Sequence, residues 1–567
     1  MTTIPSLAEV EARLTAPGAP FEMEEHEIRG VRLRTWKNAP PNLRTVFEAT
    51  AVHGPLPFII YEDERMTYAD LHAQVRVLAH QLWHHYGVRK GDRVAIAMRN
   101  FPEWPVAFWA TVIIGAVAVP LNAWWTGPEL EYGLSDSGTK VLFADHERAA
   151  RLAEHLPGLN LAATIVVRDG GAVGHGLTRF ADVLAAAPPD AAIPEVAIDP
   201  DDEATIFYTS GTTGKPKGAL GTHRNMNTNL VSLGYCVARA ELRKGNIPPS
   251  LSGEVPEKTG ALLSVPFFHA TGCHSVLVAN SAAGNKLVIM HKWDPERAIE
   301  LIEREQLRSF GGVPAMVWQV LESPAFASHD LSSIKSIGYG GAPAAPELVT
   351  RIRQVFPDVT SSNGYGLTET SSVTTMNAGP DYQRKPESVG QPVAICDVKV
   401  VDPLGKPVPD GEIGELWIRG PNVIKAYWNK PEATAQTITE GWLHSGDLAR
   451  IDEEGFVYIV DRAKDMVIRG GENVYSVEVE DALYSHPAIM DAAVIGLPHR
   501  VLGEEVGAVV QVKPGMHVTE AELQAHCRAR IASFKVPVRI DIRAEPLPRN
   551  ANGKIMKREL KQELGIA

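Results

Sequence analysis

A stretch rich in glycine, threonine and lysine occupies residues 208–218, Tyr-Thr-Ser-Gly-Thr-Thr-Gly-Lys-Pro-Lys-Gly. It follows a strand-like apolar run at residues 204–207. Glycines let a backbone turn tightly and approach an anion closely, and hydroxyl groups and lysines donate to phosphate oxygens. Two lysines, three threonines and one serine in eleven residues favour phosphate binding over a flexible surface loop. The spacing is not GxxxxGK(S/T), so an ordinary P-loop NTPase is a poor match.

Three further segments carry side chains suited to a nucleotide. Residues 363–369, Asn-Gly-Tyr-Gly-Leu-Thr-Glu, offer an amide, an aromatic ring, a hydroxyl and a carboxylate. Residues 442–447, Trp-Leu-His-Ser-Gly-Asp, end in a carboxylate that can accept from two vicinal hydroxyls. Residues 548–554, Pro-Arg-Asn-Ala-Asn-Gly-Lys, end in a lysine that position alone would make a solvated surface residue. The Gly-Gly-Ala-Pro of residues 340–343 is, taken alone, only a turn.

Taken in order over most of the chain, these segments closely resemble the adenylate-forming superfamily. That superfamily contains acyl-CoA synthetases, aryl-CoA ligases, luciferases and peptide-synthetase adenylation domains. The resemblance implies an ATP-dependent acid–CoA ligase, which joins a carboxylic acid to AMP, releases pyrophosphate and then passes the acyl group to a thiol. It also implies Mg²⁺ as cofactor, with ATP, CoA and a small-molecule carboxylic acid as substrates.

The resemblance assigns roles to individual residues. The implied ATP-binding residues are Thr209, Ser210, Gly211, Thr212, Thr213, Gly214, Lys215, Gly341, Ala342, Pro343, Asn363, Gly364, Tyr365, Asp447 and Arg462. The implied catalytic residues are Lys554, Thr368, Glu369 and His269. Glu369 is also the expected metal ligand, because Mg²⁺ needs only one or two carboxylates beside phosphate oxygens. Lys464 is implied as the hinge pivot, and Gly470, Gly471 and Glu472 as CoA-binding residues.

Residues 265–272 resemble the segment that borders the acyl pocket, with His269 at the carboxylate end. Cys273 beside His274 would suit a covalent thiol intermediate, but packing near the acyl pocket is the favoured interpretation. Phe268-His269 stands where peptide-synthetase domains commonly carry Phe-Asp, which disfavours an amino acid substrate. The other pocket segments, 312–317 and 337–341, contain no charged side chain. An apolar acid is therefore expected, either a medium- or long-chain fatty acid or an aryl acid.

Three other functions remain open at this stage. An adenylation enzyme would load a free carrier protein instead of CoA, and the chain ends too soon after Lys554 for a fused carrier domain to be expected. A regulatory nucleotide-binding protein without ligase activity is disfavoured by the full set of Thr, Glu, Asp and Lys positions. A luciferase-like oxygenase is a more distant alternative, because light chemistry depends on the substrate supplied.

The elements that must position these groups alternate along the chain. A turn at residues 90–93 precedes a predicted buried strand at 94–98. A predicted helix at 295–307 has Ala298, Leu301 and Ile302 on one apolar face and leads into the strand-like residues 309–313. Such alternation predicts an α/β (mixed α+β) fold with covered sheets.

The domain organisation is expected to be unequal. A large multi-sheet N-terminal adenylation (AMP-binding) domain takes residues 1–461, with a peripheral segment at 1–40 whose acidic cluster is solvated. The resemblance places a hinge at residues 462–464. A small mobile C-terminal α/β domain takes residues 465–567. Further predictions are a hairpin turn at 452–455, a strand at 492–495 and a helix at 520–532.

Composition sets limits on the partners. The formal net charge of −13 and the lack of clustered Lys and Arg do not favour nucleic acid. Four scattered cysteines without a CxxC pair suggest neither a zinc site nor a disulfide framework, and fit a reducing cytoplasm. An acidic N-terminus disfavours a signal peptide. The apolar run 106–121 falls short of the ~20 residues of a membrane span and predicts a buried helix that feeds a strand. A homodimer is compatible with the sequence.

Overall fold

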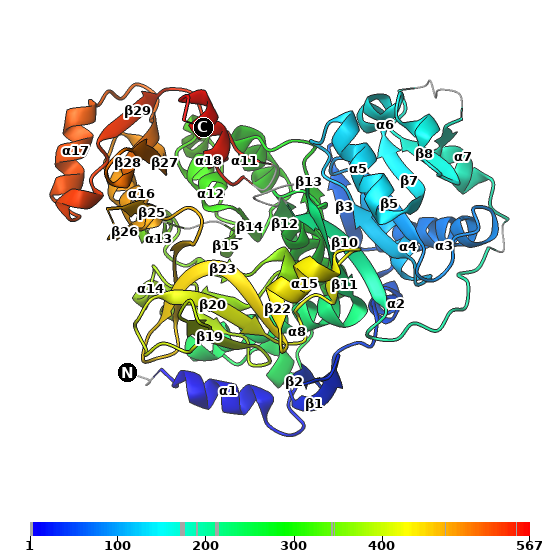
Figure 1. Cartoon of the computed structure of the whole chain (residues 1–567). Helices are drawn as coiled ribbons and strands as arrows, with labels where there is room; N and C mark the ends of the chain where they lie inside the picture. The colour runs from blue at the N-terminus through cyan, green and yellow to red at the C-terminus, as the bar shows by residue number, and fades with distance from the viewer. Residues whose placement is uncertain are drawn as a thin grey trace.

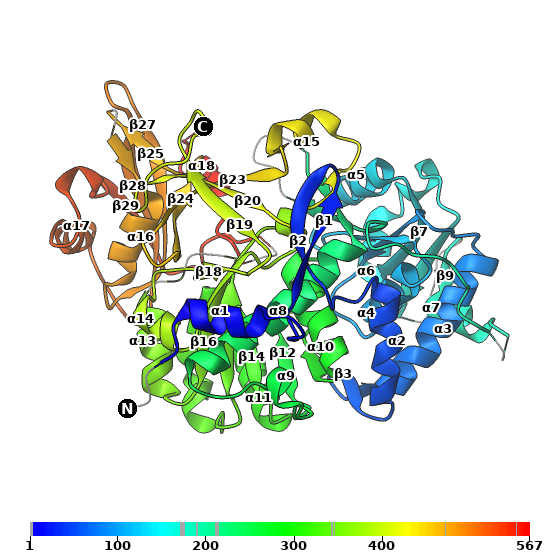
Figure 2. The same cartoon turned by 90° about the horizontal axis from the view of Figure 1, so that it is seen from below.

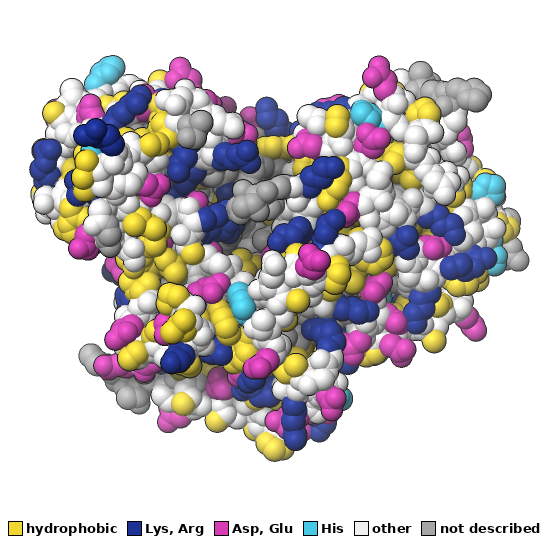
Figure 3. Space-filling view, viewed as in Figure 1, with side chains coloured by type: hydrophobic (Ala, Val, Ile, Leu, Met, Phe, Trp, Pro, Cys, Tyr) yellow, Lys and Arg dark blue, Asp and Glu magenta, His cyan; other side chains and the backbone are white. Residues whose placement is uncertain are grey.

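A computed structural model describes residues 4–170, 176–188, 191–209, 215–341, 344, 346–470, 472–550 and 553–566. Within these residues the strands form five sheets, of two, eight, nine, five and five strands. The fifth sheet, near the C-terminus, lies at one end of the molecule beside the larger part (Figure 1). The space-filling surface is hollowed between these two parts, and Lys and Arg side chains stand on the rim (Figure 3). The mixed α/β fold class is therefore confirmed.

The eight-stranded sheet has the order β21-β11-β10-β6-β5-β7-β8-β9. Its strands are β5 (Arg93–Ala97), β6 (Val117–Pro120), β7 (Thr139–Asp145), β8 (Ala163–Val167), β9 (Thr178–Arg179), β10 (Glu203–Thr209), β11 (Lys217–Thr222) and β21 (Ala426–Tyr427). Strands β6, β5, β7 and β8 run parallel, an arrangement that requires both faces to be covered. The predicted buried strand at 94–98 is confirmed as β5.

Helices cover both faces of this sheet. The helices between residues 43 and 185 are α2 (Leu43–Ala49), α3 (Tyr68–His84), α4 (Glu103–Val112), α5 (Gly127–Ser137), α6 (His146–Leu152) and α7 (Phe180–Ala185). Buried residues of α3, α4 and α7 share one hydrophobic cluster with the sheet, while those of α5 and α6 share another. Helix α4 is buried all round and leads into β6, which confirms the prediction for the run 106–121. In the described part of the chain, no helix is both long enough and apolar enough to cross a membrane.

The nine-stranded sheet has the order β18-β17-β16-β15-β14-β12-β13-β3-β4. Its strands are β3 (Pro57–Tyr61), β4 (Glu64–Thr67), β12 (Gly260–Leu263), β13 (Lys286–Ile289), β14 (Ser309–Gly312), β15 (Ser336–Gly340), β16 (Thr360–Tyr365), β17 (Thr375–Ala378) and β18 (Gln391–Pro392). Strands β14, β15 and β16 run parallel, with Gly312 opposite Tyr339 and Tyr339 opposite Asn363. Their carboxyl ends therefore meet at one edge, the usual place for a ligand in such sheets.

The predicted helix before β14 is α11 (Pro295–Arg304). Asp294 accepts a hydrogen bond from the Arg297 amide at its start, and Ala298, Leu301 and Ile302 are buried as expected. The other helices between residues 223 and 437 are α8 (His223–Arg243), α9 (Pro249–Ser252), α10 (Ala279–Ala283), α12 (Pro314–Leu321), α13 (Pro346–Val355), α14 (Pro380–Arg384) and α15 (Pro431–Thr437).

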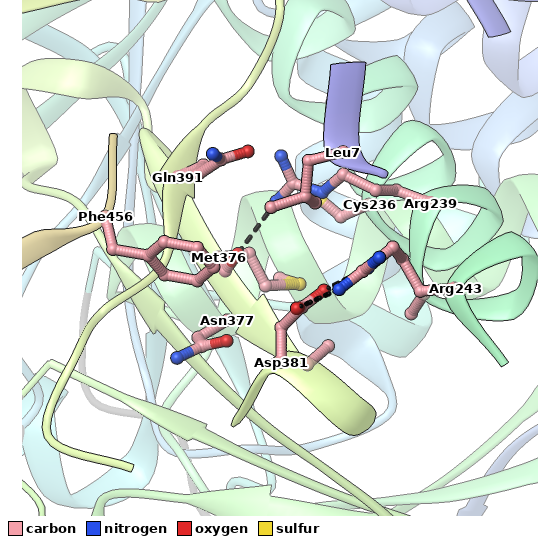
Figure 4. Close-up of a pocket in the computed structure, with 11 residues that line it drawn as sticks. Leu7, Cys236, Arg239, Arg243, Met376, Asn377, Asp381, Gln391 and Phe456 are labelled. Atoms are coloured by element: carbon pink, nitrogen blue, oxygen red, sulfur yellow. Dashed lines mark hydrogen bonds and ion pairs between the residues drawn. The ribbon is translucent and has the colours of Figure 1, made fainter. Parts of the chain in front are cut away.

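The N-terminal segment packs along α8. It consists of α1 (Leu7–Thr15), β1 (Met23–Ile28) and β2 (Val31–Trp36), and α1 lies beside α8 (Figure 2). A cavity of about 10 Å³, room for about one water molecule, lies between these helices and β17, next to the ion pair of Arg243 with Asp381 (Figure 4). Of the acidic cluster, Glu24, Glu25 and Glu27 are exposed, as expected of a solvated face, whereas Glu22 is half-buried and paired with Lys37.

The fourth sheet contains the predicted hairpin turn. Its strands are β19 (Asp397–Val401), β20 (Gly414–Arg419), β22 (Ile438–Thr439), β23 (Trp442–Ile451) and β24 (Val457–Arg462). Strands β23 and β24 run antiparallel, and the Gly455 amide donates to the Asp452 carbonyl oxygen over 2.8 Å at the turn between them. The turn at 452–455 is thereby confirmed.

The C-terminal part has its own sheet and its own hydrophobic core. Its elements are β25 (Val467–Arg469), β26 (Glu472–Val474), α16 (Ser476–Tyr484), β27 (Ile489–His499), β28 (Gly503–Val512), α17 (Glu520–Arg528), β29 (Arg539–Arg543) and α18 (Lys557–Glu563). The predicted strand at 492–495 lies inside β27. Helix α17 ends at Arg528, before the predicted residue 532, because the chain turns there and Ile531 packs against the core. The domain boundaries at 461 and 465 stay a prediction.

Candidate active site

The predicted phosphate segment joins two paired strands. Strands β10 and β11 run antiparallel, with Thr209 opposite Lys217. The Nζ of Lys215 lies 4.7 Å from the ring centre of Tyr132, and the Nζ of Lys217 lies 4.4 Å from the ring centre of Tyr427. Lys215 and Lys217 therefore lie where the segment leads into β11, a placement that suits an anion. The predicted residues outside the described ranges are Ser210, Gly211, Thr212, Thr213, Gly214, Ala342, Pro343 and Gly471.

Glu369 lies in a single helical turn, η5 (Thr368–Thr370), shortly after β16. The Tyr427 hydroxyl donates to its Oε1 over 2.7 Å, and the described residues give Oε2 no hydrogen bond. Burial and the neighbouring carboxylate raise the pKa of Tyr427, so the phenol keeps the proton that it donates. The backbone then enters the left-handed region at Ser371 (φ 53°) and Ser372 (φ 97°). Such conformations cost about 1–3 kcal/mol and cluster at functional sites.

The turn around Glu369 depends on Gly366, because a Cβ at Gly366 would lie 1.4 Å from the Ser372 carbonyl oxygen. We expect Gly366→Ala to displace the backbone of Thr368 and Glu369 and to slow acyl-adenylate formation by about 10²-fold, the cost of a displacement of about 1 Å. Acid-dependent pyrophosphate release, normalised to folded protein, measures this. The matched control is Gly158→Ala, where a Cβ meets nothing within 4 Å. Wild-type activity in Gly366→Ala would contradict the prediction.

Two of the residues predicted for the nucleotide, Tyr365 and Arg462, contact a third, Asp447. Arg462 lies opposite Asp447 on the paired strands β23 and β24, and its Nε is 3.3 Å from Oδ1 of Asp447. The Tyr365 hydroxyl donates to Oδ2 of the same carboxylate over 2.6 Å. Asp447 is only 4% exposed. The carboxylate is thus held by a cation and a phenol.

The remaining described nucleotide residues lie at the carboxyl edge of the nine-stranded sheet. Gly341 follows β15 directly, and Gly364 lies in β16 opposite Gly340. Asn363, 5% exposed, precedes Gly364; burial raises the pKa of the nearby Tyr382 phenol, and hydrogen bonding with Tyr339 and Asn363 acts against that rise. The structure therefore brings the predicted adenine and ribose segments together, at the edge where Glu369 also lies.

Lys554 reaches this edge from the C-terminal part of the chain. Next to it, Gly553 packs so closely that a Cβ there would lie 2.7 Å from Cγ2 of Val313, the residue after β14. Burial lowers the pKa of Lys554 to about 8; the nearby Arg462 lowers it too, whereas Asp447 and Glu369 oppose the shift. Because these charges act on it, the Lys554 ammonium lies among the predicted site residues.

The lowered pKa of Lys554 predicts a pH dependence. A protonated lysine is needed to offset phosphate charge, and this form predominates below about pH 8 and is lost above it. We expect kcat/KM for ATP in acyl-adenylate formation to fall at alkaline pH with a midpoint near pH 8, because kcat/KM reports the free enzyme. At saturating ATP the fall in kcat should lie at higher pH, because the bound phosphates favour the charged lysine. A midpoint for kcat/KM near pH 10 would contradict this prediction.

His269 lies near Lys554 at the start of the acyl segment. Burial, and then the charge of Lys554, lower the pKa of His269 to about 3, so the imidazole is neutral at ordinary pH. Its Nε2 is buried and has no hydrogen-bond partner among the described residues. A π-helix, η3 (Thr271–Val278), follows; π-helical turns occur frequently at functional sites. Cys273 within it is fully buried and burial raises its pKa, which leaves an inert thiol rather than a nucleophile.

The predicted hinge and CoA residues lie at different places. Lys464 is exposed and lies two residues after Arg462, which contacts Asp447. Gly470 precedes the turn between β25 and β26, and its amide donates to the Leu502 carbonyl oxygen over 2.8 Å. Glu472, after that turn, is exposed. The described hydrogen bonds and strand pairings of Gly470 and Glu472 join them to other residues of the C-terminal part, and their CoA-binding role stays a prediction.

One residue of the site escaped prediction. Tyr427 holds Glu369 although 58 residues separate them, and no motif marks it. Lys217, one of the two lysines predicted to donate to phosphate oxygens, packs on Tyr427 and so lies towards the carboxylate. Only the pairing of β21 with β11 brings Tyr427 to this place.

The chain matches the family model described as AMP-binding enzyme over residues 46–428, and the model of the AMP-binding enzyme C-terminal domain over residues 478–554. A feruloyl-CoA synthase of Amycolatopsis sp is 36% identical over 500 residues, 88% of this chain and 94% of the relative. A long-chain-fatty-acid–CoA ligase of Bacillus subtilis is 34% identical over 506 residues, 84% of this chain and 86% of the relative.

Solved structures give the same result. An anthranilate CoA ligase in complex with anthranoyl-AMP is similar with a TM-score of 0.82 at 27% identity, and covers 92% of this chain and 97% of that one. An o-succinylbenzoate CoA synthetase of Bacillus subtilis, in complex with its acyl-adenylate intermediate, has a TM-score of 0.76 at 31% identity, with 92% and 98% covered. With a family model that matches most of its length, this chain belongs to the AMP-binding enzyme family.

Proposed function

We propose that this protein is an ATP-dependent acid–CoA ligase that activates an apolar carboxylic acid as its acyl-adenylate and then forms acyl-CoA and AMP. The observation that carries the proposal is that Lys554, which follows both residues by more than 100 positions in the chain, lies near Glu369 and Asp447 at the carboxyl edge of the nine-stranded sheet. This reaction needs three groups at one place. They are a carboxylate for the metal ion, a carboxylate that accepts hydrogen bonds from the ribose, and a mobile cation.

In the first half-reaction the substrate carboxylate attacks the α-phosphorus of ATP, a new C–O–P link forms, and pyrophosphate leaves. Negative charge crowds at the phosphates, and Lys554 with Lys215 offsets it. Asp447 accepts hydrogen bonds from the ribose hydroxyls, Tyr365 offers a ring to adenine, and Thr368 contacts the α-phosphate. In the second half-reaction the CoA thiol attacks the acyl carbon, loses its proton, and AMP leaves with the electron pair of the broken C–O bond.

Glu369 suits Mg²⁺ as a single carboxylate partner. The described residues hold no group of three or more His, Cys, Asp or Glu side chains that would form a metal site of protein ligands alone. One oxygen of Glu369 is oriented by Tyr427 and the other receives no hydrogen bond from the described residues. That arrangement fits a cation held mostly by phosphate oxygens and water. Bound there, Mg²⁺ would neutralise charge on the phosphates.

The acid is an apolar one, with His269 at its carboxylate end. The neutral imidazole, whose Nε2 lacks a partner among the described residues, can hydrogen-bond an acid or acyl oxygen without adding charge. The relatives named above include one named for an aryl acid and one for long-chain fatty acids. Both classes remain in the proposal.

The C-terminal part, residues 465–567, would rotate about a hinge at 462–464 between the two half-reactions. That movement withdraws Lys554 and brings Gly470, Gly471 and Glu472 to the CoA side. We place the protein in the cytoplasm because its four cysteines are free and buried. A homodimer stays a prediction that size-exclusion chromatography with light scattering checks.

The deciding experiment is an acid panel of medium- and long-chain fatty acids and aryl acids with ATP, Mg²⁺ and CoA. We expect acid-dependent AMP formation and a thioester of the corresponding mass. A carrier-bound thiol offered in place of CoA tests the alternative acceptor. ATP split to ADP, or no acyl-adenylate with any apolar acid, would overturn the proposal.

A further inference from the structure

The turn that carries Lys554 is tied down at its first end. The Asn550 amide donates to the Lys554 carbonyl oxygen over 2.9 Å, and the Lys554 amide donates to Oδ1 of Asn550 over 3.0 Å. The Arg549 guanidinium donates both to the Gly553 carbonyl oxygen and to Asp491 on β27. Asp491 is 6% exposed. A half-buried ion pair thus fixes the start of the turn to the sheet of the C-terminal part.

The second end of the turn is tied by Lys557, three residues after Lys554. Its Nζ lies 2.7 Å from Oε1 of Glu480 on α16, and both side chains are largely buried. The Val494 amide donates to the same Glu480 oxygen over 2.8 Å. Burial acts against the ammonium, but Glu480 and other carboxylates nearby leave the pKa of Lys557 raised, so it stays charged.

Lys557 is also linked to the strand that bears the nucleotide residues. Its Nζ donates to the Ser476 hydroxyl over 2.8 Å, and that hydroxyl donates to Oδ1 of Asp461 over 2.9 Å. Asp461 also accepts from the Ser476 amide at the start of α16. Asp461 lies on β24 directly before Arg462, which pairs with Asp447. Hydrogen bonds therefore join Lys557 to Asp461, and the next residue, Arg462, carries the ion pair with Asp447.

We propose that Lys557 is a positioning residue for Lys554, which holds the turn in the place required for acyl-adenylate formation through Glu480, Ser476 and Asp461. The inference rests on the proposed function, in which Lys554 acts in the first half-reaction only. Fixing a catalytic group to better than about 1 Å is worth about 10²-fold in rate. Gly553 against Val313 shows how little space the turn has on the large part.

The test compares Lys557→Met, Lys557→Arg and the double variant Lys557→Met/Glu480→Gln with Lys561→Met as the matched control. Lys561 lies one turn later on α18, and its side chain makes no hydrogen bond or ion pair with the described residues. Each variant is assayed twice: for single-turnover pyrophosphate release with acid and ATP, and for thioester formation from supplied acyl-adenylate and CoA. Thermal unfolding is followed in parallel.

We expect Lys557→Met to slow pyrophosphate release by about 10- to 100-fold, while thioester formation from supplied acyl-adenylate stays within about twofold. Lys557→Arg keeps the charge and the donors and should recover most of the rate, and Lys561→Met should match the wild type. The double variant removes both charges of the Lys557–Glu480 pair, so it should regain part of the thermal stability and still release pyrophosphate slowly. Its alkaline limb should move above pH 8, because a displaced Lys554 regains water.

Three results would overturn the inference. They are a wild-type rate of pyrophosphate release in Lys557→Met, a double variant that recovers rate together with stability, and equal losses in both half-reactions. The proposed function fails separately, if the wild type forms no acyl-adenylate or if Lys554→Ala keeps full activity. A wild type that forms acyl-adenylate, with a slow Lys554→Ala and a fast Lys557→Met, removes the positioning role alone.

Discussion

Replacing Lys554 by alanine should slow acyl-adenylate formation by about 10²–10³-fold, the usual loss when one well-placed donor to developing charge is removed. The ammonium lies among Glu369, Asp447 and Arg462, and burial has lowered its pKa to about 8. Burial deprives this ammonium of water in the free enzyme, and the phosphate oxygens of bound ATP then replace that water. Single-turnover release of pyrophosphate, dependent on added acid, is the measurement.

Two comparisons show whether Lys554 acts in the first half-reaction alone. Thioester formation from supplied acyl-adenylate and CoA should change by less than about threefold in Lys554→Ala, because in the proposed cycle Lys554 is withdrawn from the site before the CoA thiol attacks. Lys561→Met, on the helix that follows, should leave both half-reactions unchanged. Equal losses in the two half-reactions would contradict the assignment, because they would indicate a lysine that supports the fold or binds AMP throughout.

Glu369→Gln should slow acyl-adenylate formation by about 10²-fold or more and should raise the Mg²⁺ concentration required for half-maximal rate. The amide keeps the shape of the side chain and can still accept from the Tyr427 hydroxyl, so the loss comes from the missing charge. Pyrophosphate release titrated with Mg²⁺ measures both effects. An unchanged rate and an unchanged Mg²⁺ requirement would contradict the role of Glu369.

Tyr427→Phe is the matched comparison for Glu369. It keeps the ring under Lys217 and removes only the hydrogen bond to Oε1. One hydrogen bond to a charged group contributes about 1.5–3 kcal/mol. Without it, the carboxylate of Glu369 should be less firmly oriented but should keep its charge. A loss smaller than that of Glu369→Gln is expected, with the Mg²⁺ requirement little changed.

Periodicity and turn chemistry allowed several elements to be predicted. Fully apolar runs predicted β5 and the helix–strand pair α4–β6, and an apolar face of three residues predicted α11. These predictions succeeded because the pattern of apolar residues along a short segment indicates which of its faces is buried. The turn at 452–455 followed from Asp and Gly, whose preferences are local as well. Helix α17 was predicted too long because its end is set by the contact of Ile531 with the core, which local propensity does not contain.

The amino-acid pattern was enough to predict a mixed α/β fold and the order of the segments proposed for phosphate, adenine, ribose and the catalytic lysine. It did not reveal that Tyr427 orients Glu369, that Tyr365 and Arg462 share Asp447, or that Lys557 ties the Lys554 turn to Asp461. The difference lies in the range of the interactions. Propensities and motifs act over a few residues, whereas these contacts join residues brought together by strand pairing and by the packing of the C-terminal part on the sheet edge.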